Sequence, residues 1–179
     1  MGDRILAAFL RKQHDEAMAL AEASDLLHLA PLGRSEGDPP DRYIAQFYCS
    51  GFVKGNQAPV TVADAFAVGI SFPQDYLVRA DPFSILTWFE PLTVFHPNIR
   101  PPFVCVGRIA PGTPLVDLLY QVFEIITYTK VTMREDDALN KEACAWARQN
   151  LHRFPVDRRP LKRRARALEV AAVAQTRPV

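Results

Sequence analysis

The chain has few cysteines, no clustered metal ligands and no long apolar run. Its 179 residues include only Cys49, Cys105 and Cys144, which follow no regular spacing. Such an odd and sparse set does not form a disulfide framework. Without a Cys-x-x-Cys pair or a Cys/His cluster, we expect no metal and no other cofactor. No apolar run approaches the roughly 20 residues that span a membrane, so we expect no membrane partner.

The first residues lack the features of a targeting signal. The segment MGDRILAAFLRK becomes charged after about ten residues, which is too early for a secretory signal. Gly2 is not followed by the Ser or Thr at the sixth position that myristoylation favours. We therefore expect a reducing, cytoplasmic location.

Charge is unevenly distributed along the chain. The net charge is +1, yet residues 153–179 hold eight basic and two acidic residues, so residues 1–152 are net acidic. We interpret 1–152 as one folded domain and 153–179 as a basic C-terminal helix and tail. The simplest role of that helix is a solvated element packed through Leu161 and Leu168. It lacks the interleaved aromatic residues that stack on bases, so we do not expect nucleic acid as its main partner.

The hydrophobic pattern predicts an α+β fold. Apolar residues at helical spacing predict an amphipathic helix over 3–23. Alternating residues and short links then predict a four-stranded antiparallel meander, with the helices packed on the sheet. A proline-rich stretch at 91–114 closes with Pro-Gly-Thr-Pro, in which Thr113 is the expected N-cap of the next helix and Pro114 its first position. The predicted strands cover 26–32, 42–53, 65–73 and 83–89. The last two predicted helices cover 140–151 and 160–174, and the first of them is capped by Asn140 and has Ala143, Ala147 and Leu151 on one face.

An ordered set of motifs lies within this frame. Phe72-Pro73 and Tyr76 end the third predicted strand, and His96-Pro97-Asn98 follows the fourth. Cys105 comes seven positions after the asparagine, and residues 136–143 read DDALNKEA. In the order and spacing of these motifs, residues 3–152 resemble the ubiquitin-conjugating enzymes. The resemblance implies the fold of that family, with an N-terminal helix, a four-stranded meander and C-terminal helices.

Several positions differ from the usual family pattern. Leu77 stands where the family has proline, and Val106-Gly107 stands where it has Leu-Asp. The spacing from Asn98 to Cys105 is one position shorter. These differences indicate a divergent member, similar to bacterial conjugation systems encoded beside a ubiquitin-like protein, an activating enzyme and a deconjugating protease. The resemblance implies these three proteins as partners and leaves the need for a ligase open.

The resemblance implies that Cys105 serves two acyl transfers. Its thiolate takes a ubiquitin-like protein from an activating enzyme as a thioester, and an amine, typically of lysine, then attacks that thioester. A thiol suits both steps because it is a good nucleophile and a good leaving group. By the same resemblance, Asn98 donates an N–H to the oxyanion or holds the loop. Asp137, with Asp136 as the alternate, orients the amine and accepts its proton.

Other residues are assigned supporting or partner-binding roles by the resemblance. His96, Pro97 and Tyr76 are supporting residues, and His96 fixes the turn by hydrogen bonding. The surface that meets the activating enzyme includes Arg4, Arg11 and Lys12. The two loops that meet a ligase include Val78, Pro114 and Leu115. The other two cysteines, Cys49 and Cys144, are expected to be buried structural thiols.

Alternative functions remain open from the sequence alone. One is a non-catalytic binding module built on the same scaffold, which would not need the thiol of Cys105. Another is a nucleic-acid adaptor that binds phosphates through the basic tail. A cysteine hydrolase built from His96 and Cys105 is poorly supported, because the sequence offers no evident third residue to orient the histidine.

Overall fold

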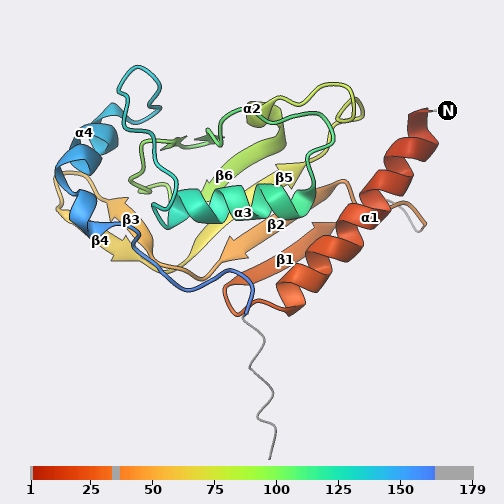
Figure 1. Ribbon diagram of the computed structural model, residues 1–179, viewed down its shortest axis with the longest axis horizontal. Coiled ribbons are helices and arrows are strands. Elements are labelled where there is room, and N and C mark those ends of the chain that lie inside the picture. The colour runs from red at the N-terminus through yellow and green to blue at the C-terminus, as the bar shows by residue number, and fades with distance from the viewer. Residues whose placement is uncertain (1, 34–36, 164–179) are drawn as a thin grey trace, which may run out of the picture.

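The described part of the chain consists of one long helix, a series of strands, three later helices and a 3₁₀ turn, which can be followed in Figure 1. The structure is a computed structural model and describes residues 2–33 and 37–163. The helices are α1 (Gly2–Glu22), α2 (Pro82–Ile85), α3 (Leu115–Ile126) and α4 (Lys141–Gln149), and a 3₁₀ turn covers Leu151–Arg153. The strands are β1 (Leu27–Leu32), β2 (Arg42–Phe47), β3 (Gly51–Lys54), β4 (Val60–Ala63), β5 (Phe66–Ser71), β6 (Leu86–Glu90), β7 (Ile99–Arg100) and β8 (Phe103–Val104).

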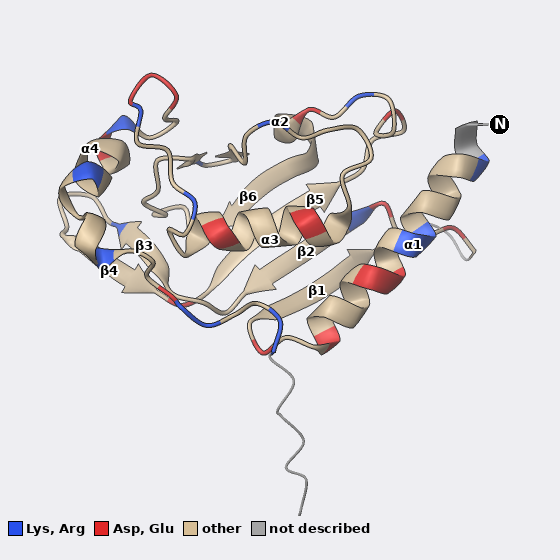
Figure 2. Ribbon diagram, in the orientation of Figure 1, with Lys and Arg blue, Asp and Glu red and all other residues tan. Residues whose placement is uncertain are grey.

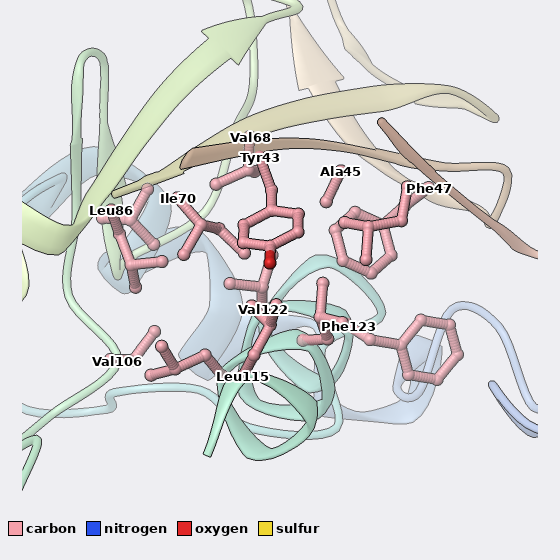
Figure 3. Close-up of a cluster of buried hydrophobic side chains, with 14 of the residues drawn as sticks. Tyr43, Ala45, Phe47, Val68, Ile70, Leu86, Val106, Leu115, Val122 and Phe123 are labelled. Atoms are coloured by element: carbon pink, nitrogen blue, oxygen red, sulfur yellow. The ribbon is translucent and has the colours of Figure 1, made fainter. Parts of the chain in front are cut away.

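A four-stranded antiparallel sheet forms the centre of the fold. Its strand order is β1-β2-β5-β6, which confirms the predicted α+β class and antiparallel sheet. Helix α3 packs across one face of this sheet, and α1 lies beside α3 and β1 (Figure 1). Tyr43 and Ile70 from the sheet point toward Val122 of α3 in the core (Figure 3). Each large apolar side chain buried in this way contributes about 1.5–3 kcal/mol to folding.

The predicted single strand at 42–53 is wrong, because the chain turns a corner after Phe47. β3 leaves the main sheet and pairs with β4 as a separate hairpin. The backbone of the corner bonds to distant side chains. The Ser50 N–H donates to the carboxylate of Asp157 at 3.0 Å, and Arg159 donates to the Tyr48 carbonyl at 3.3 Å. These partners satisfy backbone groups that would otherwise continue the strand ladder.

The predicted strand at 83–89 begins too early. Residues Pro82–Ile85 form one helical turn, α2, and the strand starts at Leu86. The Asp81 carboxylate accepts the Phe83 N–H at 3.1 Å, and Pro82 occupies the first helical position. An aspartate N-cap followed by proline is a helix-start signal, and it overrides the local alternation of apolar residues.

Helix α3 lacks the predicted threonine cap. Its N-cap is Pro114, and its first N–H, that of Leu115, donates to the side-chain oxygen of Gln13 on α1 at 2.9 Å. The Thr113 hydroxyl instead donates to the Ala110 carbonyl at 2.7 Å. The start of α3 is therefore capped by a buried glutamine from α1, about a hundred residues away in sequence.

The C-terminal segment differs from the predicted helices. Asn140 caps α4 as predicted, since its side chain accepts the Ala143 N–H at 3.0 Å. Leu151, predicted to share one helix face with Ala143 and Ala147, is 57% exposed, whereas both alanines are buried. Residues 160–163 are not helical, yet Leu161 is only 1% exposed and joins the main core. The rest of the predicted helix at 160–174, including Leu168, lies outside the described residues. None of the described helices has both the length and the apolar character that crossing a bilayer requires.

Candidate functional site

Asn98 and Cys105 face each other across the small β7–β8 hairpin. Because that hairpin reverses the chain between them, their backbones come together although they are seven residues apart. The Cys105 N–H donates to the Asn98 carbonyl at 2.8 Å, and the Asn98 side-chain Nδ2 donates to the Cys105 carbonyl at 3.0 Å. The backbone on both sides of the Cys105 Cα atom is therefore fixed by one asparagine.

The Asn98 amide also reaches the segment that follows α3. Its Oδ1 accepts the Thr132 N–H at 2.9 Å. Asn98 is only 5% exposed, so these hydrogen bonds are shielded from competing water. Since the amide oxygen accepts and the amide nitrogen donates, its orientation is set by the two partners together. Asn98 thus joins the cysteine loop to the segment that leads to Asp137.

His96 supports this turn as a neutral ring. Its Nδ1 accepts the Asn98 N–H at 3.0 Å, so the ring proton resides on Nε2. Burial lowers the pKa of His96 to about 3, because a charged imidazolium is poorly solvated there. The ring also packs against Tyr128 with centroids 4.2 Å apart. His96 is therefore a structural acceptor at neutral pH and is not exposed to act as a base.

Cys105 is the one cysteine of the three that is not buried. It is partly exposed, whereas Cys49 and Cys144 are fully buried. Burial raises the pKa of the Cys49 thiol to about 12, and the Cys144 thiol donates to the Thr132 carbonyl at 3.6 Å. A reagent or partner that reacts with thiols in the folded protein therefore meets Cys105 first.

Lys130 is a neighbour of this loop that the sequence did not reveal. Its ammonium donates to the Val106 carbonyl at 2.6 Å, directly after Cys105. Gly107, the next residue, has φ of +90°, a conformation that favours glycine. The lysine is far from the cysteine in sequence and belongs to no recognisable motif, so no local signal identifies it. This hydrogen bond fixes the backbone directly after Cys105.

Asp136 and Asp137 lie in an exposed loop before α4. Both carboxylates contact Arg134, which bonds to Asp136 Oδ2 at 2.5 Å and lies 3.3 Å from Asp137 Oδ2. The sequence predicted roles for Asp136 and Asp137 but none for Arg134, whose side chain contacts both carboxylates. The Asn140 N–H donates to the Pro97 carbonyl at 3.1 Å, which ties the end of this loop to the turn that holds Asn98.

A hollow of about 790 Å³ separates this loop from the β7–β8 hairpin. The wall from the hairpin ends two residues before Cys105, and the wall from the loop begins directly after Asp137. Apolar groups form most of the lining, with a cationic side chain from each wall. The lining residues are Arg100, Pro101 and Phe103 from the hairpin, and Ala138, Leu139, Asn140 and Lys141 from the loop and α4.

The residues assigned to partner surfaces divide into exposed and buried groups. Val78 is 83% exposed, and Arg4, Arg11 and Lys12 are exposed on α1. Pro114 is half-buried, while Leu115 is fully buried, so the Leu115 side chain is not part of an outer surface. Tyr76 is also fully buried, and its hydroxyl donates to the Thr113 carbonyl at 2.7 Å. It braces the loop that leads into α3.

Within residues 2–33 and 37–163, no group of three or more His, Cys, Asp or Glu side chains is arranged to hold a metal ion. Comparison of the chain with known proteins found no matching family model and no matching curated protein.

Proposed function

We propose that the chain accepts a ubiquitin-like protein as a thioester on Cys105 and transfers it to an amine, as the ubiquitin-conjugating enzymes do. The observation that carries this proposal is the pairing of Cys105 with Asn98. Two hydrogen bonds fix the backbone around a partly exposed thiol, while the other two thiols are buried. A loop held in this way keeps the sulfur available to two large partners in turn.

Both proposed steps are acyl transfers between nucleophiles. In the first, the Cys105 thiolate bonds to the carbonyl carbon of a thioester on the activating enzyme, and the thiolate of that enzyme leaves. In the second, an amine bonds to the same carbonyl carbon, the carbon–sulfur bond breaks, and Cys105 is restored as a thiol. A lysine that arrives as an ammonium gives up two protons in forming the amide. One goes to a nearby acceptor, and the other goes to the departing Cys105 thiolate, which is thereby restored as a thiol. The site therefore needs a nearby proton acceptor but no cofactor.

Asn98 is best described as a positioning residue in this proposal. Its Nδ2 carries two hydrogens, and one already bonds to the Cys105 carbonyl. Its Oδ1 is occupied by the Thr132 N–H. These contacts favour a role in holding the loop over a role as a dedicated oxyanion donor.

Asp137 is the proposed acceptor of the amine proton, with Asp136 as the alternate. Both carboxylates are more than half exposed, so an incoming lysine can reach them. Lysine has an unperturbed pKa near 10.4, and a carboxylate that accepts its proton therefore assists attack at neutral pH. The bond from Asn140 to the Pro97 carbonyl supports a fixed placement of this loop beside the cysteine turn.

The test is a charging reaction with an activating enzyme, ATP and the ubiquitin-like protein of the same conjugation system. We expect an adduct that a reducing agent cleaves. Cys105→Ser should give an oxyester that resists reduction, and Cys105→Ala should give no adduct. Cys144→Ala, which removes a buried thiol, is the matched control and should charge normally. An adduct that survives in Cys105→Ala would overturn the proposal.

A further inference from the structure

Arg134 contacts both of the carboxylates proposed to receive the acceptor amine. Its Nε and Nη2 donate to the two oxygens of Asp136 at 3.2 and 2.5 Å. The same Nε lies 3.3 Å from Asp137 Oδ2. A guanidinium keeps its charge throughout the working pH range and matches the two oxygens of a carboxylate. The two acids therefore already hold a cation of the protein.

A second arginine neutralises the remaining acid of this loop. Arg148 on α4 lies 3.4 Å from the Glu135 carboxylate and also donates to the Met133 carbonyl at 3.4 Å. Figure 2 shows the acidic stretch of the loop before α4 and the basic residues beside it. An approaching lysine ammonium therefore meets carboxylates that already hold guanidinium groups, and it must compete with Arg134 for the oxygens of Asp136 and Asp137.

We propose that Arg134 is a positioning residue that withholds Asp137 and Asp136 from an acceptor amine until a carboxylate of the acceptor binds the guanidinium. The inference rests on the proposed function of the same site. In the exchange, Arg134 moves from the loop acids to the carboxylate of the acceptor, and the lysine takes its place beside Asp137. Arg134 and Asp137 each exchange one ion partner for another. The favoured acceptor is therefore a lysine with an acidic neighbour.

The exposure of these groups sets the size of the effect. The Arg134, Asp136 and Asp137 side chains are 73%, 65% and 59% exposed. Exposed ion pairs of this kind change equilibria by roughly two- to fivefold. Arg134 is therefore expected to adjust the choice and rate of acceptor use, while the chemistry on Cys105 continues without it.

The test is a double-mutant cycle between the protein and its acceptor. Cys105 is first loaded by thioester exchange with a Gly-Gly-ended peptide thioester of 2-mercaptoethanesulfonate. In that exchange the Cys105 thiolate takes the acyl group and 2-mercaptoethanesulfonate leaves. Discharge is then followed by mass spectrometry with two capped peptides, Lys-Glu and Lys-Gln. We expect the wild-type protein to discharge onto Lys-Glu roughly two- to fivefold faster than onto Lys-Gln.

The variant Arg134→Gln should remove this preference. It should raise discharge onto Lys-Gln, chiefly by lowering the apparent KM for the peptide, because the competing cation is gone. Arg134→Lys should retain part of the preference. Discharge by hydroxylamine, which is uncharged at neutral pH, should be unchanged by Arg134→Gln. The matched control is Arg148→Gln, which removes the guanidinium that pairs with Glu135 of the same loop but leaves Asp136 and Asp137 paired.

The outcomes separate this inference from the proposed function. One result would overturn the role of Arg134 alone: fast lysine discharge that depends on Asp137, but with equal rates onto Lys-Glu and Lys-Gln in both the wild-type protein and Arg134→Gln. Failure of the loaded wild-type protein to discharge onto any amine faster than a free cysteine thioester would overturn the proposed function itself.

Discussion

Asn98 and Cys105 are joined by a pair of hydrogen bonds, from the cysteine N–H to the asparagine carbonyl and from the asparagine side chain to the cysteine carbonyl, at 2.8 and 3.0 Å. Both bonds involve the backbone of the cysteine, and neither uses its sulfur. The asparagine can therefore fix the position of the thiol while leaving it free to react. The same amide accepts the Thr132 N–H, so the cysteine loop and the following segment share one support.

Replacing Asn98 with alanine should weaken both the fold and the proposed transfer. The change leaves the Cys105 carbonyl and the Thr132 N–H without these partners, and a lost buried hydrogen bond costs about 1–3 kcal/mol. Urea denaturation measures that loss, and discharge of the loaded thioester measures the effect on transfer. Asn150→Ala is the matched control, because it removes a bond to the Trp146 carbonyl away from the cysteine loop. It should lower stability but leave discharge unchanged, and equal loss of discharge in both variants would contradict the role of Asn98.

Alkylation should distinguish the three thiols. In the folded protein, iodoacetamide should modify Cys105 and leave Cys49 and Cys144 intact, because both are fully buried. In urea all three should react. Intact mass and peptide mapping give the number and sites of modification. Modification of Cys144 at the rate of Cys105 in the folded protein would contradict the arrangement described.

His96 should make stability depend on pH. Its folded pKa of about 3 lies below the unfolded value of about 6.5. The unfolded chain therefore binds the proton more readily, and stability falls as pH drops from about 6.5 toward 3. Between pH 7.5 and 5.5, we expect the wild-type protein to lose about 1 kcal/mol more than His96→Asn, which keeps an acceptor near the Asn98 N–H but does not titrate. Identical losses in both proteins would show that His96 is not buried as a neutral ring.

Asp157 should anchor the C-terminal segment to the corner between β2 and β3. Its buried carboxylate accepts the Ser50 N–H and pairs with Arg159, and that arginine holds the pKa of Asp157 down at about 2. This stabilisation is present above about pH 3.8 and is lost as pH falls toward 2. Asp157→Asn should cost about 2 kcal/mol, since hydrogen bonds to charged groups contribute about 1.5–3 kcal/mol.

Besides urea denaturation, which measures the loss of stability, alkylation of Cys49 measures the Asp157 contact. Loosening this corner should expose the adjacent Cys49, so Asp157→Asn should speed its modification without changing that of Cys105. Asp25→Asn, which removes an exposed partner of Arg163, is the matched control and should change neither stability nor labelling appreciably. Faster labelling of Cys49 in the Asp25 variant as well would show that the effect is not specific to the Asp157 contact.

Local sequence patterns were sufficient for the elements that are defined by short-range periodicity. The spacing from Leu115 to Ile126 predicts α3, and strict alternation around Val68 predicts β5. Asn140 also signals its own helix start. The antiparallel sheet follows from short links between alternating segments.

The errors arise where distant residues decide the local structure. The apolar run at 42–53 appears continuous, yet Asp157 and Arg159 hold the backbone where it bends. The cap of α3 comes from Gln13 on another helix. At the candidate site, the sequence identified Asn98 and Cys105 as a motif, but Lys130 and Arg134 emerged only from three-dimensional contacts.

The most direct test of the central claim is the rate at which lysine discharges an acyl group from Cys105. The protein is loaded with the Gly-Gly peptide thioester, and a synthetic peptide covering residues 100–110 is loaded in the same way. Both are then treated with Nα-acetyl-lysine amide at neutral pH. We expect the folded protein to discharge on the order of 100-fold faster than the peptide, with most of the advantage lost in Asp137→Asn. Equal rates for the protein and the peptide would contradict a catalytic site at Cys105.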